Sequence, residues 1–300
     1  MTPNSGYIYR DRVPEGFAGL GVLDYHRTRF VHSTAEVWIE ALAAGRLRIN
    51  GRTAQDQDVL CAGDRLEYHR APWNEPEVPL KFEVCFEDED VLAAIKPSGL
   101  QVLPAGPFFE NTLLHQVRAS ATSRADASPI HRLGRGTSGL ILFGKSPLAR
   151  AELARQFRDF ETRKSYLALV IGCGLPHSAL ARHPIGKVPH GRLQIHVASV
   201  LGKPALTRVR VLRRDTEAQR SLVCAQPITG RADQIRIHLA ALGAPIVGDP
   251  LFGAGGTPIS DARPGEGGYH LHAAALSFVH PRTQRWIKLR SLPTWSLGAR

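Results

Sequence analysis

Apolar and polar residues recur with two different periods along this chain, and each period predicts one kind of element. Helical spacing first occurs after residue 33, where the apolar positions are Ala35, Trp38, Ile39 and Leu42. Ser33 and Glu36 form a capping box before this helix, and Gly45 is a typical stop. Strict alternation begins at residues 46–49 and ends in an Asn-Gly turn, which predicts a short strand.

Continuous apolar runs predict buried strands from residue 91 onward. The clearest runs are residues 91–95, 140–143 and 165–170, and a basic alternating strand follows at residues 207–212. Ser146 and Pro147 are typical of a helix start, and the apolar spacing after them predicts a helix over residues 147–160. Both helices and strands are therefore expected in this chain.

Two stretches with little periodicity divide the chain. Residues 1 to about 30 carry prolines, glycines and charges, so we expect an irregular lead-in. Residues 70–80 contain three prolines and are interpreted as a linker. We therefore expect a small domain over residues 1–75 and a large domain over residues 80–300.

The charge balance favours a polyanionic partner. The chain has 38 Lys and Arg against 27 Asp and Glu, a formal net charge of +11. Cationic surfaces bind phosphates and release counterions, so RNA, DNA or an acidic surface would fit.

The four cysteines are isolated, without a Cys-x-x-Cys pair. This indicates neither a disulfide framework nor a structural metal. The first 20 residues have no apolar signal core. We expect a cytoplasmic monomer without a structural metal.

One glycine-rich segment combines cationic, hydroxyl and apolar residues. It runs over residues 129–145 as Pro-Ile-His-Arg-Leu-Gly-Arg-Gly-Thr-Ser-Gly-Leu-Ile-Leu-Phe-Gly-Lys. Its glycines permit close approach of a partner to the backbone, and the apolar run after them predicts a strand that holds the loop. A basic hairpin turn is the other interpretation.

The order His-Arg-Leu, Thr-Ser-Gly-Leu, apolar strand and Lys in this segment resembles the signature loop of RluA-type RNA pseudouridine synthases. Further blocks resemble that family in its own order, at residues 96–104, 164–170, 229–249 and 271–281. The resemblance covers about residues 80–285. It implies an α+β fold, with a catalytic domain built on a mixed, mainly antiparallel β-sheet with flanking helices. It also implies a reaction that needs no metal and no redox cofactor.

Three parts of the first domain resemble an S4-like RNA-binding domain: the helix after residue 33, the Gly-Arg-Leu-Arg-Ile-Asn-Gly of residues 45–51 and the Gly-Asp of residues 63–64. In such a domain Arg46, Arg48 and Arg52 would face RNA phosphates. The other interpretation is a small α+β domain whose arginines are simply solvated.

The resemblance also implies roles for single residues. Tyr166 would pack on a flipped uracil and could act as the base at C5, or it is a core aromatic. Arg236 would pair with the catalytic acid, or it is an ordinary helix arginine. Arg132 would enter the RNA stack, and His131 would support the loop, although surface roles remain open for both. Further RNA contacts are expected from Lys96, Arg135, Lys164 and Arg231.

The sequence departs from the family pattern at its most important position. The catalytic aspartate that the resemblance implies after His-Arg-Leu is Gly134 here, which has no side chain. Asp233 stands where the family has a histidine, three residues before Arg236, and is the candidate replacement acid. It could instead be a first-turn helix acid favoured by the macrodipole. Asp249, in Gly-Asp-Pro, is interpreted as a turn residue.

These observations lead to two hypotheses. The first is an RNA pseudouridine synthase that flips a uridine of a structured rRNA or tRNA and isomerises it with a rearranged acid. The second is a catalytically inactive RNA-binding protein of the same fold. Both hypotheses predict RNA as the partner, but only the first predicts that the protein catalyses a reaction on it.

Overall fold

The computed structural model describes residues 3–191, 193–256, 258–259 and 268–296. The chain divides into two compact units, Met1–Glu75 and Pro76–Arg300. The first unit contains one hydrophobic cluster, and the second contains three. No helix in the described ranges is long and apolar enough to cross a membrane.

The first unit is a four-stranded antiparallel sheet with two helices. The strand order is β1-β4-β2-β3. The elements are β1 (Tyr7–Arg12), η1 (Glu15–Phe17), α1 (Val22–Arg29), α2 (Ala35–Ala43), β2 (Leu47–Ile49), β3 (Arg52–Thr53) and β4 (Arg65–Arg70). Leu47 and Ile49 point into a core that also contains Tyr25 and Trp38, so the alternation in β2 separates a buried face from a solvent face.

The irregular lead-in predicted for residues 1–30 is wrong, because β1 and α1 lie within it. All six residues of β1 pair with β4 through backbone hydrogen bonds. Backbone pairing does not require alternating apolar side chains, so a polar strand such as β1 shows no hydrophobic period in the sequence. Helix α1 buries only Val22, Tyr25 and His26, too few for a clear helical period. The N-cap of α2 is Thr34 and not the predicted Ser33.

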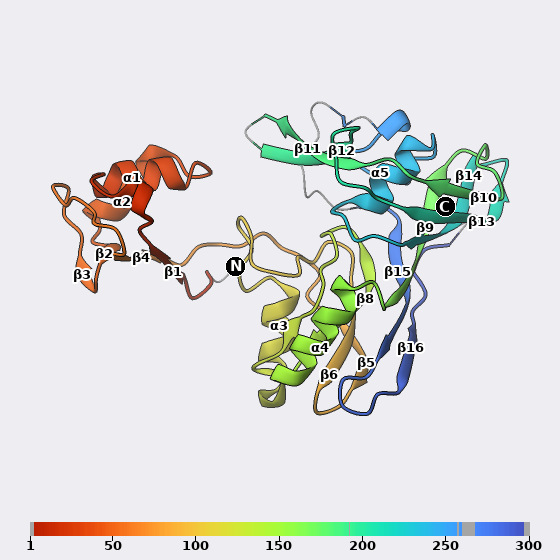
Figure 1. The fold of residues 1–300 in the computed structure, drawn as a ribbon, viewed down its shortest axis with the longest axis horizontal. Coiled ribbons are helices and arrows are strands. Elements are labelled where there is room, and N and C mark those ends of the chain that lie inside the picture. The colour runs from red at the N-terminus through yellow and green to blue at the C-terminus, as the bar shows by residue number, and fades with distance from the viewer. Residues whose placement is uncertain (1–2, 192, 257, 260–267, 297–300) are drawn as a thin grey trace. The chain divides into compact units, whose positions relative to one another are not determined.

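The second unit is built on a ten-stranded mixed sheet (Figure 1). The order is β10-β13-β14-β9-β15-β8-β6-β5, with β16 on β15 and β7 on β8. The strands are β5 (Glu83–Glu87), β6 (Val91–Lys96), β7 (Ser128–Pro129), β8 (Ser138–Gly144), β9 (Arg163–Ile171), β10 (Ser178–Ala181), β13 (Thr207–Asp215), β14 (Arg220–Pro227), β15 (Leu271–Val279) and β16 (Trp286–Arg290). Only β15 and β8 pair in parallel among these described strands, so the predicted mixed, mainly antiparallel α+β fold is confirmed.

Helices and a separate hairpin complete this unit. They are α3 (Leu113–Ala119), η2 (Thr122–Arg124), α4 (Pro147–Arg158), α5 (Gln234–Ala241), η3 (Ala254–Gly256) and the β11 (Ile185–His190)–β12 (Leu193–Ala198) pair. The predicted helix 147–160 is confirmed as α4, where Ser146 Oγ accepts the N–H of Ala149 at 3.2 Å.

Two hydrophobic clusters share the sheet of the second unit. Helices α3 and α4 contribute to one cluster and α5 to the other. Tyr166 of β9 packs against both clusters. At the parallel β15–β8 junction, a Cβ on Gly139 would overlap the backbone of Ala273, so only glycine fits where β8 leaves the glycine-rich loop.

A buried carboxylate gives the second unit a predicted dependence on pH. Asp90 is 2% exposed and accepts hydrogen bonds from Arg282 and, at 2.6 Å, from Ser146 Oγ. The Arg282 hydrogen bond is the main cause that lowers the pKa of Asp90 from 3.8 to about 2. A lowered folded-state pKa stabilises the fold above the unfolded pKa and loses this effect as the pH falls.

We expect Asp90→Asn to lower the free energy of unfolding by about 1–2 kcal/mol at pH 7, since the exposed Arg282 is partly screened by solvent. The difference from wild type should shrink as the pH falls from about 4 to about 2. Urea unfolding across this range measures it. A difference that stays constant with pH would contradict this role of Asp90.

Candidate active site

A fully buried lysine fixes the loop after β6. The ammonium of Lys96 donates to the backbone oxygens of Pro97 and Leu100, both at 2.8 Å, and of Arg135 at 3.0 Å. Burial, and then the charge of Arg135, lower the pKa of Lys96 from 10.5 to about 7. The RNA contact predicted for Lys96 would therefore require this loop to open.

The same loop is bound to the glycine-rich loop by two further hydrogen bonds. Ser98 Oγ donates to the oxygen of Gly136 at 2.7 Å, and the N–H of Gly99 donates to the oxygen of Arg135 at 2.8 Å. The loop after β6 and the glycine-rich loop, almost 40 residues apart in sequence, are thus joined by hydrogen bonds into one unit, which we call the rigid loop wall.

Gly134 faces the hydroxyl of a buried tyrosine. A Cβ at position 134 would lie 2.6 Å from Tyr269 Oη and 3.5 Å from Thr137 Oγ1. Tyr269 is 4% exposed, and its hydroxyl lies 3.0 Å from Thr137 Oγ1. The φ of Gly134 is not in the left-handed region, so the position requires glycine for space and not for backbone conformation.

Arg236 of α5 holds two carboxylates. Its Nε and Nη2 donate to Asp249 at 2.8 and 2.7 Å, and its Nη1 donates to Asp233 at 2.7 Å. The guanidinium carbon lies 4.3 Å from the Tyr269 ring centroid and 4.9 Å from that of Phe252. Burial is the largest single effect and would lower the pKa of Arg236. The hydrogen bond to Asp249 and the charges of Tyr269, Asp233 and Asp249 together outweigh it, so the pKa is raised.

The two carboxylates differ in exposure and in the number of their contacts. The Asp249 side chain is 1% exposed and also accepts the N–H groups of Leu251 and Phe252 at 2.9 and 3.1 Å. The Asp233 side chain is 31% exposed, and within the described residues its carboxylate contacts only Arg236. Asp249 therefore neutralises the buried guanidinium, and Asp233 keeps one oxygen for another partner.

Asp233 occupies an unusual backbone position. Its φ of 53° and ψ of 14° are left-handed, a conformation that costs free energy in residues other than glycine. It is the N-cap residue of α5, yet its carboxylate does not cap the helix. Asp233 thus lies one residue before the first turn of α5, where the helix dipole also favours an acid. Gln234 fixes this turn by accepting from Thr229 Oγ1 at 2.7 Å and from the N–H of Arg231 at 3.0 Å.

Tyr166 lies on the central strand β9, opposite Ala225 of β14 and Ala273 of β15. It packs against the cluster that contains Tyr269. Burial raises the pKa of the Tyr166 phenol to about 12. Its hydroxyl has no hydrogen-bond partner within the part of the chain that the structure describes.

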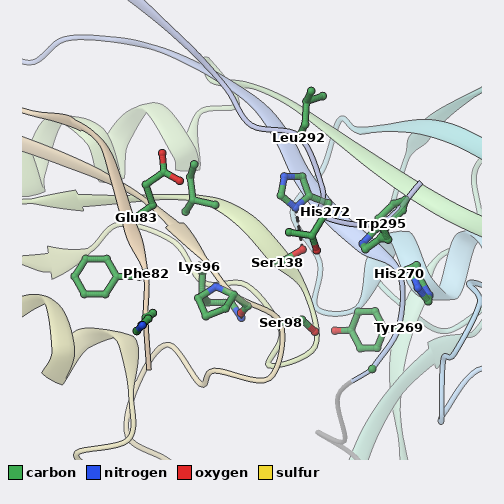
Figure 2. A pocket seen from close by; sticks show the side chains of 15 residues that line it. Phe82, Glu83, Lys96, Ser98, Ser138, Tyr269, His270, His272, Leu292 and Trp295 are labelled. Carbon is green, nitrogen blue, oxygen red and sulfur yellow. Dashed lines mark hydrogen bonds between the residues drawn. The ribbon is translucent and has the colours of Figure 1, made fainter. Parts of the chain in front are cut away.

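A pocket of about 530 Å³ adjoins Tyr269 and the rigid loop wall. Figure 2 shows lining side chains, among them Lys96, Ser98, Ser138, Tyr269, His272 and Trp295. Ser138 Oγ and His272 Nδ1 lie 2.8 Å apart, and His272 Nε2 lies 3.1 Å from Ser291 Oγ. This volume is within the range of small-molecule sites.

Two predicted RNA-binding residues of the loop region are partly buried. His131 Nε2 accepts the N–H of Leu142 at 3.2 Å, and its ring stacks on Phe157 at 4.6 Å. Burial, and then the charge of Lys164, lower the pKa of His131 to about 3, so the imidazole is neutral. The Lys164 ammonium lies 5.2 Å from the Phe157 ring centroid, and burial lowers its pKa. These contacts agree with a supporting role for His131.

Other predicted RNA-binding residues lie at or near the surface. Arg132 is exposed, Arg231 Nε donates to the oxygen of Pro204 at 3.2 Å, and the Arg135 guanidinium lies 5.3 Å from the Phe108 ring centroid. None of these three forms an ion pair with a described residue.

The arginines predicted to face phosphates in the first unit differ from one another. Arg46 pairs with Glu40 at 2.7 Å, and both arms of the Arg52 guanidinium contact Asp58 at 2.7 Å. Arg48 is exposed, without an ion pair to a described residue. Arg48 is thus the most accessible of the three to a phosphate.

Sequence reasoning missed Tyr269 and the second role of Asp249. Asp249 does stabilise a turn, but its carboxylate also pairs with Arg236. Tyr269 stands two residues before the recognised block Leu271-His272-Ala273, so that block was the signal that could have drawn attention to it. No group of three or more potential metal ligands occurs within the described residues.

Comparisons with known proteins identify the family. The family model described as RNA pseudouridylate synthase matches residues 90–241. An uncharacterized RNA pseudouridine synthase of Synechocystis sp. is 45% identical over 89% of this chain and 92% of its own length. Ribosomal large subunit pseudouridine synthase D of Neisseria meningitidis is 32% identical, over 89% of this chain and 72% of its own. The chain therefore belongs to the RNA pseudouridine synthase family.

A solved structure supports the fold. The human RNA pseudouridylate synthase domain containing 1 superposes with a TM-score of 0.58 at 24% identity, over 73% of this chain and 86% of its own. The family membership and fold inferred from the ordered blocks are thus confirmed.

The contact between positions 134 and 269 can be tested by a double-mutant cycle. We expect Gly134→Ala to lower the free energy of unfolding by about 1–3 kcal/mol, because its methyl group would overlap Tyr269 Oη. In Tyr269→Phe the hydroxyl is gone, and the nearest ring atom, Cζ, lies 4.0 Å away. The same substitution should then cost much less. Urea unfolding of the four proteins measures the difference, and equal costs in both backgrounds would exclude this steric relation.

Proposed function

We propose that the protein isomerises uridine to pseudouridine in a structured RNA, with Asp233 as the catalytic carboxylate. Family membership supports the reaction, and the net charge of +11 supports the polyanionic substrate. The ribosomal substrate in the name of the Neisseria relative favours rRNA, with tRNA as the other structured RNA to examine. The reaction would take place in the cytoplasm.

The reaction needs a small set of groups. The N1–C1′ bond breaks, the uracil turns, a C5–C1′ bond forms, the C5 proton leaves and N1 gains a proton. Atoms and electrons balance without an oxidant or a reductant. A carboxylate must lie beside the ribose, and a base must lie near C5.

The arrangement around Arg236 carries the proposal. Asp249 already satisfies the buried charge, so the second carboxylate on the same guanidinium is not required to neutralise it. Asp233 is partly exposed, is held by a charge-assisted hydrogen bond and lies on a strained backbone. Such positions are enriched at functional sites.

The other residues have supporting roles in this proposal. Tyr166 packs on the flipped uracil. Its protonated phenol relays the C5 proton, accepting it as its own hydroxyl proton passes on towards N1, and Arg236 orients Asp233. Flipping a base out of its stack costs a few kcal/mol, so side chains must fill the vacated space or hold the strand. We assign this role to Arg132, with Arg135, Lys164 and Arg231 on the phosphates.

The second candidate is an RNA-binding protein without turnover. The observation that favours it is the absence of any side chain at position 134, where the phenol of Tyr269 fills the adjoining space. This protein would share the charge and fold and would lack isomerase activity.

We expect Asp233→Ala to reduce pseudouridine formation by about 100-fold or more, because no other described carboxylate replaces the lost oxygen on Arg236 Nη1. The substitution should leave the fold and RNA affinity intact, since Asp249 remains on the guanidinium. Pseudouridine is mapped in cellular RNA incubated with each protein. Glu217→Ala, an exposed acid on the turn between β13 and β14, is the matched control and should retain activity.

Each outcome separates the candidates. If wild type forms no pseudouridine on any RNA but still binds it, the binding protein is favoured. If Asp233→Ala is fully active, the isomerase stands and Asp233 has no part in its chemistry.

A further inference from the structure

The solvent face of the first unit's sheet carries a group of arginines. In β2 the buried side chains are Leu47 and Ile49, so Arg48 between them points to the opposite face. Arg48 and Arg10 both lie opposite Glu67 of β4 in the strand register, one on each side. These three side chains therefore share the solvent face.

Two more arginines on this face lie directly opposite each other. Arg12 of β1 is the register partner of Arg65 of β4, and both are exposed. Like charges at directly opposed positions of an antiparallel pair are destabilising. Neither guanidinium forms an ion pair or a hydrogen bond with a described residue. The fold thus maintains a repulsive pair that a bound anion would relieve.

The acid on this face is already occupied. Glu67 accepts from Arg10 at 3.0 Å and lies 2.9 Å from His69 Nε2. Glu67 therefore forms no ion pair with Arg12, Arg48 or Arg65. Arg12 and Arg65 lie on neighbouring strands, which are about 4.8 Å apart, well within the Debye length of about 8 Å at physiological salt, so these two charges reinforce each other. Arg48 lies one strand and two residues from Arg65, at about 8 Å, and extends the same basic surface.

We propose that Arg12, Arg48 and Arg65 form a binding surface for the phosphate backbone of RNA, which we call the arginine face. Guanidinium groups match phosphate geometry with two parallel hydrogen bonds. The choice of RNA over another polyanion rests on the proposed function. Tyr7 and Tyr9, the exposed aromatics of β1, lie on the opposite side of the strand from Arg10 and Arg12. The arginine face therefore contacts backbone phosphates without stacking these rings on bases.

The arginine face differs from the surface expected from sequence. Arg46 and Arg52 have acidic partners, whereas Arg12 and Arg65 were not among the arginines expected to face RNA and have no acidic partner among the described residues. Arg48 belongs to both sets. The backbone of an RNA bound here would therefore cross β1, β4 and β2.

The test compares the full-length protein with its Arg12→Gln/Arg65→Gln variant. The probes are an RNA hairpin of about 20 base pairs and a uridine oligomer of about 20 nucleotides, titrated by fluorescence anisotropy between about 50 and 200 mM salt. The slope of log affinity against log salt should fall by about 0.9 for each lost contact on the hairpin, or about 0.7 on the single strand. At about 0.1 M salt this corresponds to a roughly five- to tenfold loss of affinity for each contact.

Two controls separate charge from location. Arg12→Lys/Arg65→Lys keeps both charges and should keep most of the salt slope. Arg52→Gln removes an arginine that is already paired with Asp58 and should change the slope little.

Thermal unfolding excludes a merely structural role. Because Arg12 and Arg65 repel each other, the glutamine variant should keep or raise the melting temperature of the first unit while it loses affinity. An unchanged salt slope on both probes, or a lower melting temperature that accounts for the loss of binding, would overturn the proposal. The titration needs no turnover, so its result stands whether or not the protein isomerises uridine.

Discussion

The buried guanidinium of Arg236 is the constraint on which the candidate site depends. Placing an unpaired charge in a protein interior costs several kcal/mol, so this side chain requires an acid of its own. Asp249 meets the requirement with two hydrogen bonds, and the rings of Tyr269 and Phe252 lie close to the guanidinium. With the charge satisfied, the exposed Asp233 carboxylate is held in one orientation by its single contact. The same guanidinium thus binds one carboxylate that neutralises it, Asp249, and a second carboxylate that is open to another partner, Asp233.

The glycine-rich loop and α5 meet through Tyr269. Its hydroxyl lies against Gly134 and Thr137, and its ring lies against Arg236. A side chain at position 134 and the Tyr269 phenol would compete for the same volume. In the proposed mechanism, the position without an acid on the loop and the acid before α5 belong to one arrangement, in which Asp233 supplies the carboxylate.

Much of this arrangement could be predicted from local patterns. Two features depend only on residues close in sequence, and the structure confirms them. They are helix α4, with its apolar spacing and Ser-Pro start, and the contact between Asp233 and Arg236. The contact of Thr137 with Tyr269 spans 132 residues, and no local period predicts such a pair. Asp249 was interpreted only as a turn residue, because its ion pair with Arg236 depends on the tertiary structure and not on the local sequence. Strand β1 was missed for the same reason, since its pairing with β4 is long-range.

The free energies of unfolding of Asp249→Asn and Asp233→Asn, measured side by side in urea, test this division of roles most directly. Removing one partner of a buried ion pair typically costs about 3–5 kcal/mol, and we predict a loss of this size for Asp249→Asn. For Asp233→Asn we predict a loss below about 1 kcal/mol, because its side chain is partly exposed and the guanidinium stays paired. Equal losses, or a larger loss for Asp233→Asn, would contradict the account.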